Sequence, residues 1–229
     1  MSWLRRAELI TCLVILAIVF VVPLGISFIR GNTPPPPPVL EPTNQRTYAE
    51  QQESIAIDHW KLERYKQAAD VLLALWSKQS HSAVKGNYDP ALARTMTEVA
   101  CLYRDWARFK ESKDVYATLI DYTKKRITVD YNALAREYNG LATTEYAEGN
   151  AEKAPDKRRR CFEQAELDYK QAFDISTANS PDQNLFRGLV QANQANVSRE
   201  LGNESIAQKL EADAQRNGIN FFGIERSPL

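Results

Sequence analysis

Glycine, cysteine, histidine and net charge are all scarce in this sequence of 229 residues. Its nine glycines make up about 4% of the chain, against a usual value of ~7%. So few glycines leave few sites for tight turns, which disfavours a β-rich fold and a glycine-rich phosphate-binding enzyme. Three cysteines are too few for a disulfide scaffold. Because 29 basic residues balance 29 acidic ones, bulk electrostatics also argues against nucleic acid as a partner.

Patterns typical of catalysis and metal binding are absent too. The zinc-protease pattern HExxH, the hydrolase pattern GxSxG and the phosphate-binding pattern GxxxxGK do not occur. His59 lies at a helix-packing position, and His81 has no second ligand at metal-binding spacing. Cys101 and Cys161 are interpreted as small buried hydrophobes, although they could pair in an oxidising compartment. We therefore expect no enzyme, no cofactor and no metal; the alternative is an enzyme whose site lies in the third repeat's insertion and the tail.

The longest apolar run covers residues 9–29, which carry no charge. A helix of that length rises about 30 Å, enough to cross the hydrocarbon core of a bilayer. Arg5 and Arg6 precede the run, while only Arg30 follows closely. By the positive-inside rule, residues 1–8 are cytoplasmic and everything after the run is on the other side. This predicts a single-pass protein with the lipid bilayer as a partner of residues 9–29, as in a bacterial inner-membrane protein facing the periplasm.

A cleaved signal peptide is the competing interpretation of the same run. Gly25 and Ser27 have the small-residue spacing that a signal peptidase accepts. Apolar residues continue past that point, which favours a retained anchor. Both interpretations place the folded domain outside the cytoplasm.

Residues 30–46 form a proline-rich linker with five consecutive prolines. Such a run favours an extended polyproline II rod, with a rise of ~3.1 Å per residue. We interpret it as a stiff spacer between anchor and domain; a ligand for a proline-binding module is the alternative.

From residue 47 to residue 217 the apolar pattern has the period of amphipathic helices. Thr47 with Glu50 predicts a capping box at the first helix. Asp89-Pro90 and Ser180-Pro181 predict two further helix starts. Gly149-Asn150 and Gly202-Asn203 predict breaks between helices.

Four units with two helices each can be aligned within this region. Each unit has a small residue in both helices, so that two antiparallel helices can approach closely: Ala56 and Ala68, Ala100 and Ser112, Ala142 and Ala165, Ala195 and Ala207. The two residues are 12 positions apart in three units and 23 in the third, which therefore has an insertion of 11 residues. Aromatic residues are expected at the turns, with a large residue seven positions on along the same face: Tyr65 and Leu72, Phe109 and Tyr116, Phe162 and Tyr169.

These units resemble tetratricopeptide (TPR) repeats, most clearly over residues 94–119. The resemblance implies an all-α, TPR-like array of about four helical hairpins. The sequence departs from the family pattern, because alanine replaces the usual glycine of the first helix and the closing proline is absent. The repeats are also longer than the family value of ~34 residues.

The resemblance further implies a concave groove, lined by the first helix of each pair, that binds a peptide or a partner helix. Carried onto this chain, the groove positions are Glu53, Ile57, Trp60, Arg94, Thr97, Cys101, Arg104, Arg136, Asn139, Thr143, Tyr146, Asn196 and Arg199. Trp60 and Tyr146 are expected to act as aromatic anchors. Arg104, Arg136 and Arg199 give the wall positive charge suited to carboxylates, unless they pair with Asp105, Glu137 and Glu200.

Two surface segments remain open to two interpretations each. The basic run 157–160 is either a solvated helix end or a contact for anionic lipid headgroups or an acidic partner. The tail 218–229 either folds back through Phe221, Phe222 and Ile224 or docks a partner.

Taken together, the sequence predicts a membrane-anchored protein–protein interaction module, a scaffold or assembly factor. The alternative is an accessory subunit of a single membrane complex, in which the transmembrane helix itself makes specific contacts.

Overall fold

The computed structural model describes residues 47–83, 87–179 and 182–219, and within these ranges the chain is helical without strands. Its helices are α2 (Tyr48–Lys61), α3 (Tyr65–Ser82), α4 (Pro90–Asp105), α5 (Phe109–Lys124), α6 (Tyr131–Ala151), α7 (Pro155–Asn179), α8 (Asn184–Glu200) and α9 (Glu204–Arg216). No helix in the described ranges is long and apolar enough to cross a membrane. The predicted anchor at 9–29 and linker at 30–46 lie outside them.

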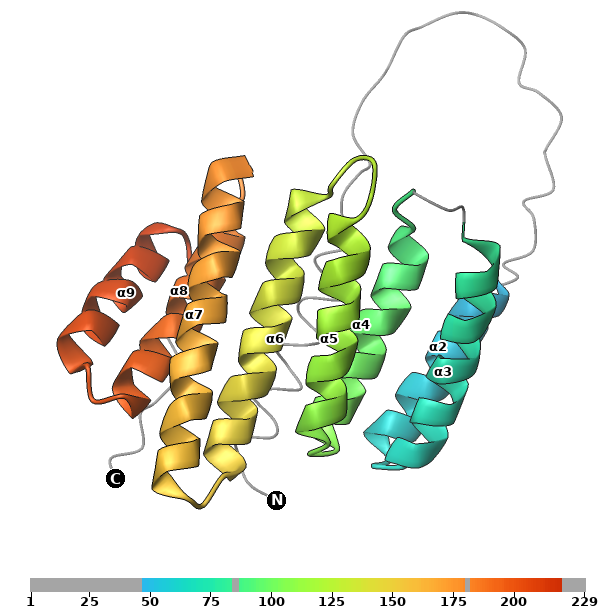
Figure 1. Cartoon of the computed structure of the whole chain (residues 1–229), viewed down its shortest axis with the longest axis horizontal. Coiled ribbons are helices and arrows are strands. Elements are labelled where there is room, and N and C mark those ends of the chain that lie inside the picture. The colour runs from blue at the N-terminus through green and yellow to red at the C-terminus, as the bar shows by residue number, and fades with distance from the viewer. Residues whose placement is uncertain (1–46, 84–86, 180–181, 220–229) are drawn as a thin grey trace, which may run out of the picture. The chain divides into compact units, whose positions relative to one another are not determined.

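The eight described helices pair into four antiparallel hairpins: α2/α3, α4/α5, α6/α7 and α8/α9 (Figure 1). Each helix packs against the next one in the chain, and α4 also packs against α6 and α6 against α8. The described residues all belong to one compact unit of the chain. The expected all-α array of four hairpins is thus what the described residues form.

Small residues allow the two helices of each hairpin to cross at close range, as predicted. All eight crossing residues are buried, and none exposes more than 1% of its surface. In the second hairpin the Ser112 hydroxyl donates a 2.7 Å hydrogen bond to the carbonyl of Ala100 across the crossing. A larger side chain at such a position would push the helix axes apart.

The insertion in the third hairpin is entirely helical, which the sequence interpretation missed. All four hairpins have a turn of three residues: 62–64, 106–108, 152–154 and 201–203. Measured from the crossing residues, α6 is four residues longer than the other first helices, and α7 is seven residues longer than the other second helices at its start. These additions account for all 11 inserted residues. Because 11 residues make about three helical turns, the register of the crossing is kept.

Two predictions about this hairpin were therefore wrong. Gly149 and Asn150 do not break the chain but lie inside α6, and the turn comes at residues 152–154. Phe162 is not at the turn but two turns into α7, where it packs on Gly149. A Cβ on Gly149 would lie only 2.6 Å from the Phe162 ring, so this glycine serves close helix packing.

Helix starts follow the predicted caps with one exception. The Thr47–Glu50 capping box is present, and the Asp89 carboxylate accepts hydrogen bonds from the first turn of α4. The helix predicted to begin at Pro181 begins instead at Asn184, because Asp182 and Gln183 are not helical. Ser180 and Pro181, and the tail beyond Ile219 with its two phenylalanines, lie outside the described residues.

Two hydrophobic clusters form the core. The first joins α2, α3, α4 and α5, and the second joins α5, α6, α7 and α8. The predicted large residues Leu72, Tyr116 and Tyr169 are each no more than 2% exposed. Since all of these buried residues come from residues 56–197, the compact unit has a core of its own.

The middle residues of three turns have positive φ angles, and two of them are not glycine. Glu63 has φ 56° and Ala107 has φ 59°, whereas Gly202 has φ 82°. The left-handed conformation is strained for residues with a Cβ and unstrained for glycine.

We therefore expect Ala107→Gly to raise the free energy of unfolding by about 0.5–1 kcal/mol. Urea denaturation measures this change. Ala117→Gly, at an exposed position inside α5, is the control and should lower stability by a similar amount. A loss of stability in both variants would show that the turn is not strained.

Candidate partner-binding face

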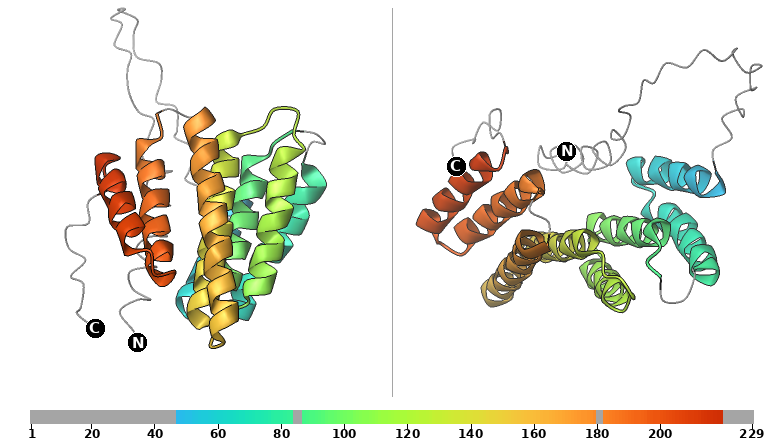
Figure 2. Two further views of the ribbon diagram at one scale, coloured as in Figure 1. Left: turned by 60° about the vertical axis from the view of Figure 1, so that its left-hand side comes forward. Right: turned by 90° about the horizontal axis from the view of Figure 1, so that it is seen from above.

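The first helices of the four hairpins share one side of the array, which we call the first-helix face. In the right-hand view of Figure 2, α2, α4, α6 and α8 lie on the inner side of an arc of helices. Side chains connect these helices directly, through Arg94 and Glu53 between α4 and α2, and through Asn193 and Asn139 between α8 and α6. All predicted groove residues are on these four helices, as the helical spacing required.

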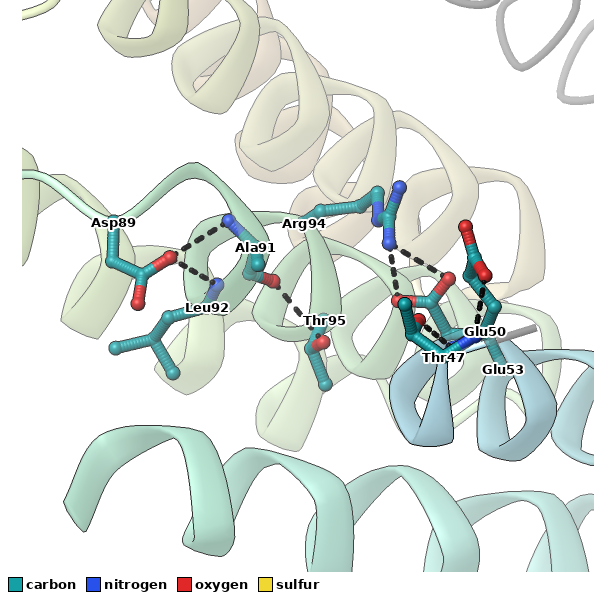
Figure 3. Close-up of polar contacts among 8 residues, drawn as sticks. All are labelled: Thr47, Glu50, Glu53, Asp89, Ala91, Leu92, Arg94 and Thr95. Atoms are coloured by element: carbon teal, nitrogen blue, oxygen red, sulfur yellow. Dashed lines mark hydrogen bonds and ion pairs between the residues drawn. The ribbon is translucent and has the colours of Figure 1, made fainter. Parts of the chain in front are cut away.

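The strongest of these contacts is the ion pair between Arg94 and Glu53. One guanidinium nitrogen of Arg94 lies 2.6 and 2.8 Å from the two carboxylate oxygens of Glu53 (Figure 3). The Glu53 side chain is only 11% exposed, whereas that of Arg94 is 35% exposed. Both were predicted as groove residues, but here they hold the first hairpin to the second.

Glu98 lies beside this ion pair and was not predicted as a site residue. Burial, followed by the negative charge of Glu53, raises the pKa of Glu98 to about 7. Its Oε2 atom is buried and accepts no hydrogen bond from a described residue. The signal was present in the sequence, because Glu98 follows Arg94 by four residues and so shares its side of α4.

Uncharged polar side chains occupy the middle of the face. The Thr143 hydroxyl lies 3.0 Å from the Tyr169 hydroxyl, which reaches through from α7. The Cys101 thiol lies 3.4 Å from the Tyr116 hydroxyl, which comes from α5. Second-helix tyrosines thus contact first-helix polar residues, which helical periodicity alone did not reveal.

Asn139 and Asn193 form a pair across α6 and α8. The amide nitrogen of Asn193 donates to the Oδ1 of Asn139 over 3.3 Å. The Nδ2 of Asn139 and the Oδ1 of Asn193 have no hydrogen-bond partner among the described residues. The pair therefore presents one donor group and one acceptor. Asn193 was missed from the sequence, although it lies three residues before the predicted Asn196.

The three predicted arginines have different surroundings. Arg104 pairs with Asp105 at 3.0 Å, as the pairing interpretation expected. Arg199 pairs with Glu211 at 2.6 Å and Glu204 at 3.4 Å, both from α9, and not with Glu200.

Arg136 is exposed on α6. Its expected partner, Glu137, instead accepts a 2.7 Å hydrogen bond from the Thr123 hydroxyl. Only Arg136 of the three thus lacks a salt bridge to another described residue.

The two predicted aromatic anchors are both half-buried. Trp60 packs against the first hydrophobic cluster. Tyr146 packs against the second, with its ring 5.6 Å from that of Phe162. Part of each aromatic side chain is therefore packed in a hydrophobic cluster, and part is accessible. Asn196, by contrast, is exposed.

Two cavities in the described part lie away from this face. One of about 580 Å³ lies between the loops that precede α4 and α6, and is lined by Tyr88, Ile127 and Val129 among others. A smaller one of about 160 Å³ lies between the start of α7 and Leu201.

Among the described residues no group of three or more His, Cys, Asp or Glu could hold a metal ion. Cys101 and Cys161 form no disulfide with a described residue, and both are half-buried, more exposed than predicted. Burial raises the pKa of the Cys161 thiol. His59 is half-buried, in line with its packing position, and His81 is exposed at the end of α3.

Comparisons with family models and with curated proteins gave no match. Among solved structures, BtubC (BKLC) from P. vanneervenii aligns with a TM-score of 0.48 and 17% identity over 75% of this chain. The aligned part spans 57% of BtubC. A putative kinesin light chain with TPR-like repeats from Podosopora anserina gives 0.39 and 14% identity over 73% of this chain and 93% of that one. A variant of the latter gives a TM-score of 0.40 and 13% identity over 73% of this chain and 92% of that one. With every TM-score below 0.5, neither fold nor function is inferred from these likenesses.

Proposed function

We propose that the chain is a membrane-anchored interaction module whose first-helix face binds an extended peptide or a partner helix. The observation that carries this proposal is the Asn139–Asn193 pair, with its one unpartnered donor group and one unpartnered acceptor. An extended peptide main chain presents the complementary groups, a carbonyl and an N–H, on each residue. Tyr146, Thr143 and Asn196 lie on the same two helices and supply apolar and polar contacts around the pair.

The absence of strong charge in the middle of the face favours main-chain recognition over recognition of an acidic or basic segment. Arg104 and Arg199 are already neutralised by carboxylates, so they add little net attraction. Arg136 remains as a cation at the edge of the face and would orient the bound segment through a carboxylate.

The membrane part of the proposal comes from the sequence. Residues 9–29 are long and apolar enough for one span. Anchoring raises the local concentration of the domain near partners in the same membrane.

Peptide display against the full chain in detergent micelles, followed by isothermal titration calorimetry, tests the binding face. We expect Asn139→Ala and Tyr146→Ala each to weaken binding of a selected peptide by about tenfold or more, because they remove hydrogen bonds and an aromatic contact. Gln171→Ala is the matched control, since Gln171 is exposed on the second-helix side of α7. Peptides that lose affinity with Gln171→Ala, and keep it with the other two variants, would place binding elsewhere.

A further inference from the structure

The tip of the third hairpin, residues 148–163, extends beyond the tips of its neighbours. Nine residues of α6 follow its crossing residue Ala142, whereas in α2, α4 and α8 only five residues follow the crossing residue of each helix. Ten residues of α7 precede Ala165, whereas three precede the crossing residue of α3, α5 and α9. At 1.5 Å per residue the tip therefore projects about 6–10 Å further than the others, as the α6–α7 turn in Figure 1 shows.

This tip carries an excess of positive charge. Residues 152–160 contain five basic and two acidic residues. Arg158 pairs with Glu200 at 2.6 Å, and Arg159 pairs with Glu163 at 2.8 Å. Lys153, Lys157 and Arg160 are exposed and form no salt bridge with a described residue.

The three cations without a salt bridge lie within eight residues of one another. Lys157 and Arg160 are three residues apart on α7 and so share a helical face, and Lys153 lies in the turn just before this helix. The tip also contains two acidic residues, Glu152 in the turn and Asp156 four residues before Arg160 on α7. Glu152 is also engaged locally, because its carboxylate accepts the backbone N–H groups of Lys153 and Ala154.

We propose that this cationic tip is a peripheral contact for an anionic phospholipid surface, the bilayer in which the chain's own anchor lies. The proposal rests on the membrane anchoring proposed above. No large hydrophobic side chain is exposed at the tip, so its accessible charged groups suit a flat anionic surface better than an apolar protein interface. Lysine and arginine side chains near an anionic bilayer each add to the attraction.

The chain is long enough for the tip to reach that bilayer. The helix α7 has 25 residues and is about 38 Å long. The 17 residues from 30 to 46 span at most about 60 Å when extended. At full extension this segment would exceed the length of α7, so the covalent connection permits the tip to touch the membrane from which the chain emerges.

Co-sedimentation of residues 46–229 with vesicles tests this contact without the anchor. Vesicles of phosphatidylcholine alone are compared with vesicles that contain about 30 mol% phosphatidylglycerol, each at low and at high salt. We expect binding only to the anionic vesicles, weakening as salt rises. Lys153→Glu, Lys157→Glu and Arg160→Glu combined should lower the partition coefficient about tenfold or more.

The matched control reverses three charges at the shorter first tip: Lys61→Glu, Arg64→Glu and Lys66→Glu. These residues are also exposed, so both variants change the net charge equally. Retained binding in the control supports a specific tip contact, and equal loss in both variants overturns it. Absence of wild-type binding to anionic vesicles also overturns it, while leaving peptide binding by the first-helix face untouched. Circular dichroism verifies that each variant remains helical.

Discussion

Replacing Glu145 by glutamine is expected to stabilise the protein at neutral and alkaline pH. Glu145 is 7% exposed in the interface of α6 with α7, and its carboxyl group is hydrogen-bonded to Asp168, which is 8% exposed. Burial, then the charge of Asp168 and this hydrogen bond, raise the pKa of Glu145 to about 9. The nearby Lys113, which pairs with Glu148, lowers it only in part.

The sign of the pH dependence follows from proton binding. In the unfolded chain Glu145 has its ordinary pKa, given as 4.5. Between about 4.5 and about 9 the folded protein therefore holds a proton that the unfolded chain releases. The contribution of Glu145 to stability is thus fully present below pH 4.5, falls as pH rises through this window, and levels off above about 9.

Glutamine keeps the shape and the hydrogen bond to Asp168 but has no proton to lose. We expect the wild type and Glu145→Gln to have similar stability near pH 5, and the variant to gain on the order of a few kcal/mol by pH 9. Urea denaturation at pH 5, 7 and 9 measures the difference between the two curves. Glu163→Gln, at an exposed ion pair, is the control and should show no such widening. A difference that stays constant with pH would contradict the buried-carboxyl account.

Replacing Arg94 by alanine is expected to lower the stability of the first hairpin, α2/α3. The carboxylate of Glu53 would remain buried without its partner, and that penalty dominates when one member of a buried pair is removed. Because Arg94 itself is a third exposed, we expect a loss of about 1–3 kcal/mol, at the lower end for such pairs.

The loss should be local, because each hairpin of a repeat array contacts only its neighbours. Hydrogen exchange is expected to quicken in α2 and α3 and to stay unchanged in α8 and α9. Glu53→Gln in the Arg94→Ala background should recover part of the stability, since it removes the unpaired charge. Lys170→Ala breaks an exposed pair with Asp174 and should cost no more than about 0.5 kcal/mol. Equal effects of Lys170→Ala and Arg94→Ala would mean that the α2–α4 ion pair is no more than a surface contact.

Local sequence was sufficient for the helices and for the positions where they cross. Capping at Thr47 and Asp89 depends on side chains within three residues of the helix start. The crossings depend on small residues, and these are visible in any alignment of the four units. The same spacing placed the predicted site residues on the first helices, since helical periodicity fixes which residues share a side.

Where local signals competed, the sequence misled. Glycine followed by asparagine usually ends a helix, and it does so at Gly202. At Gly149 the same pair lies inside α6, because Phe162 from α7 needs the space that a side chain would fill. No pattern within α6 could distinguish these two uses of glycine, since the distinguishing contact comes from another helix.

The amino-acid sequence by itself determined the helical class, the four hairpins, their crossing residues and the apolar run near the N-terminus, because periodicity and short-range sterics act over a few residues. The tertiary structure decided that the insertion lengthens two helices, that Glu145 meets Asp168, and which arginines are neutralised. Those outcomes depend on which distant side chains come together on packing, and charge, burial and close approach are properties of that assembly and not of any one segment.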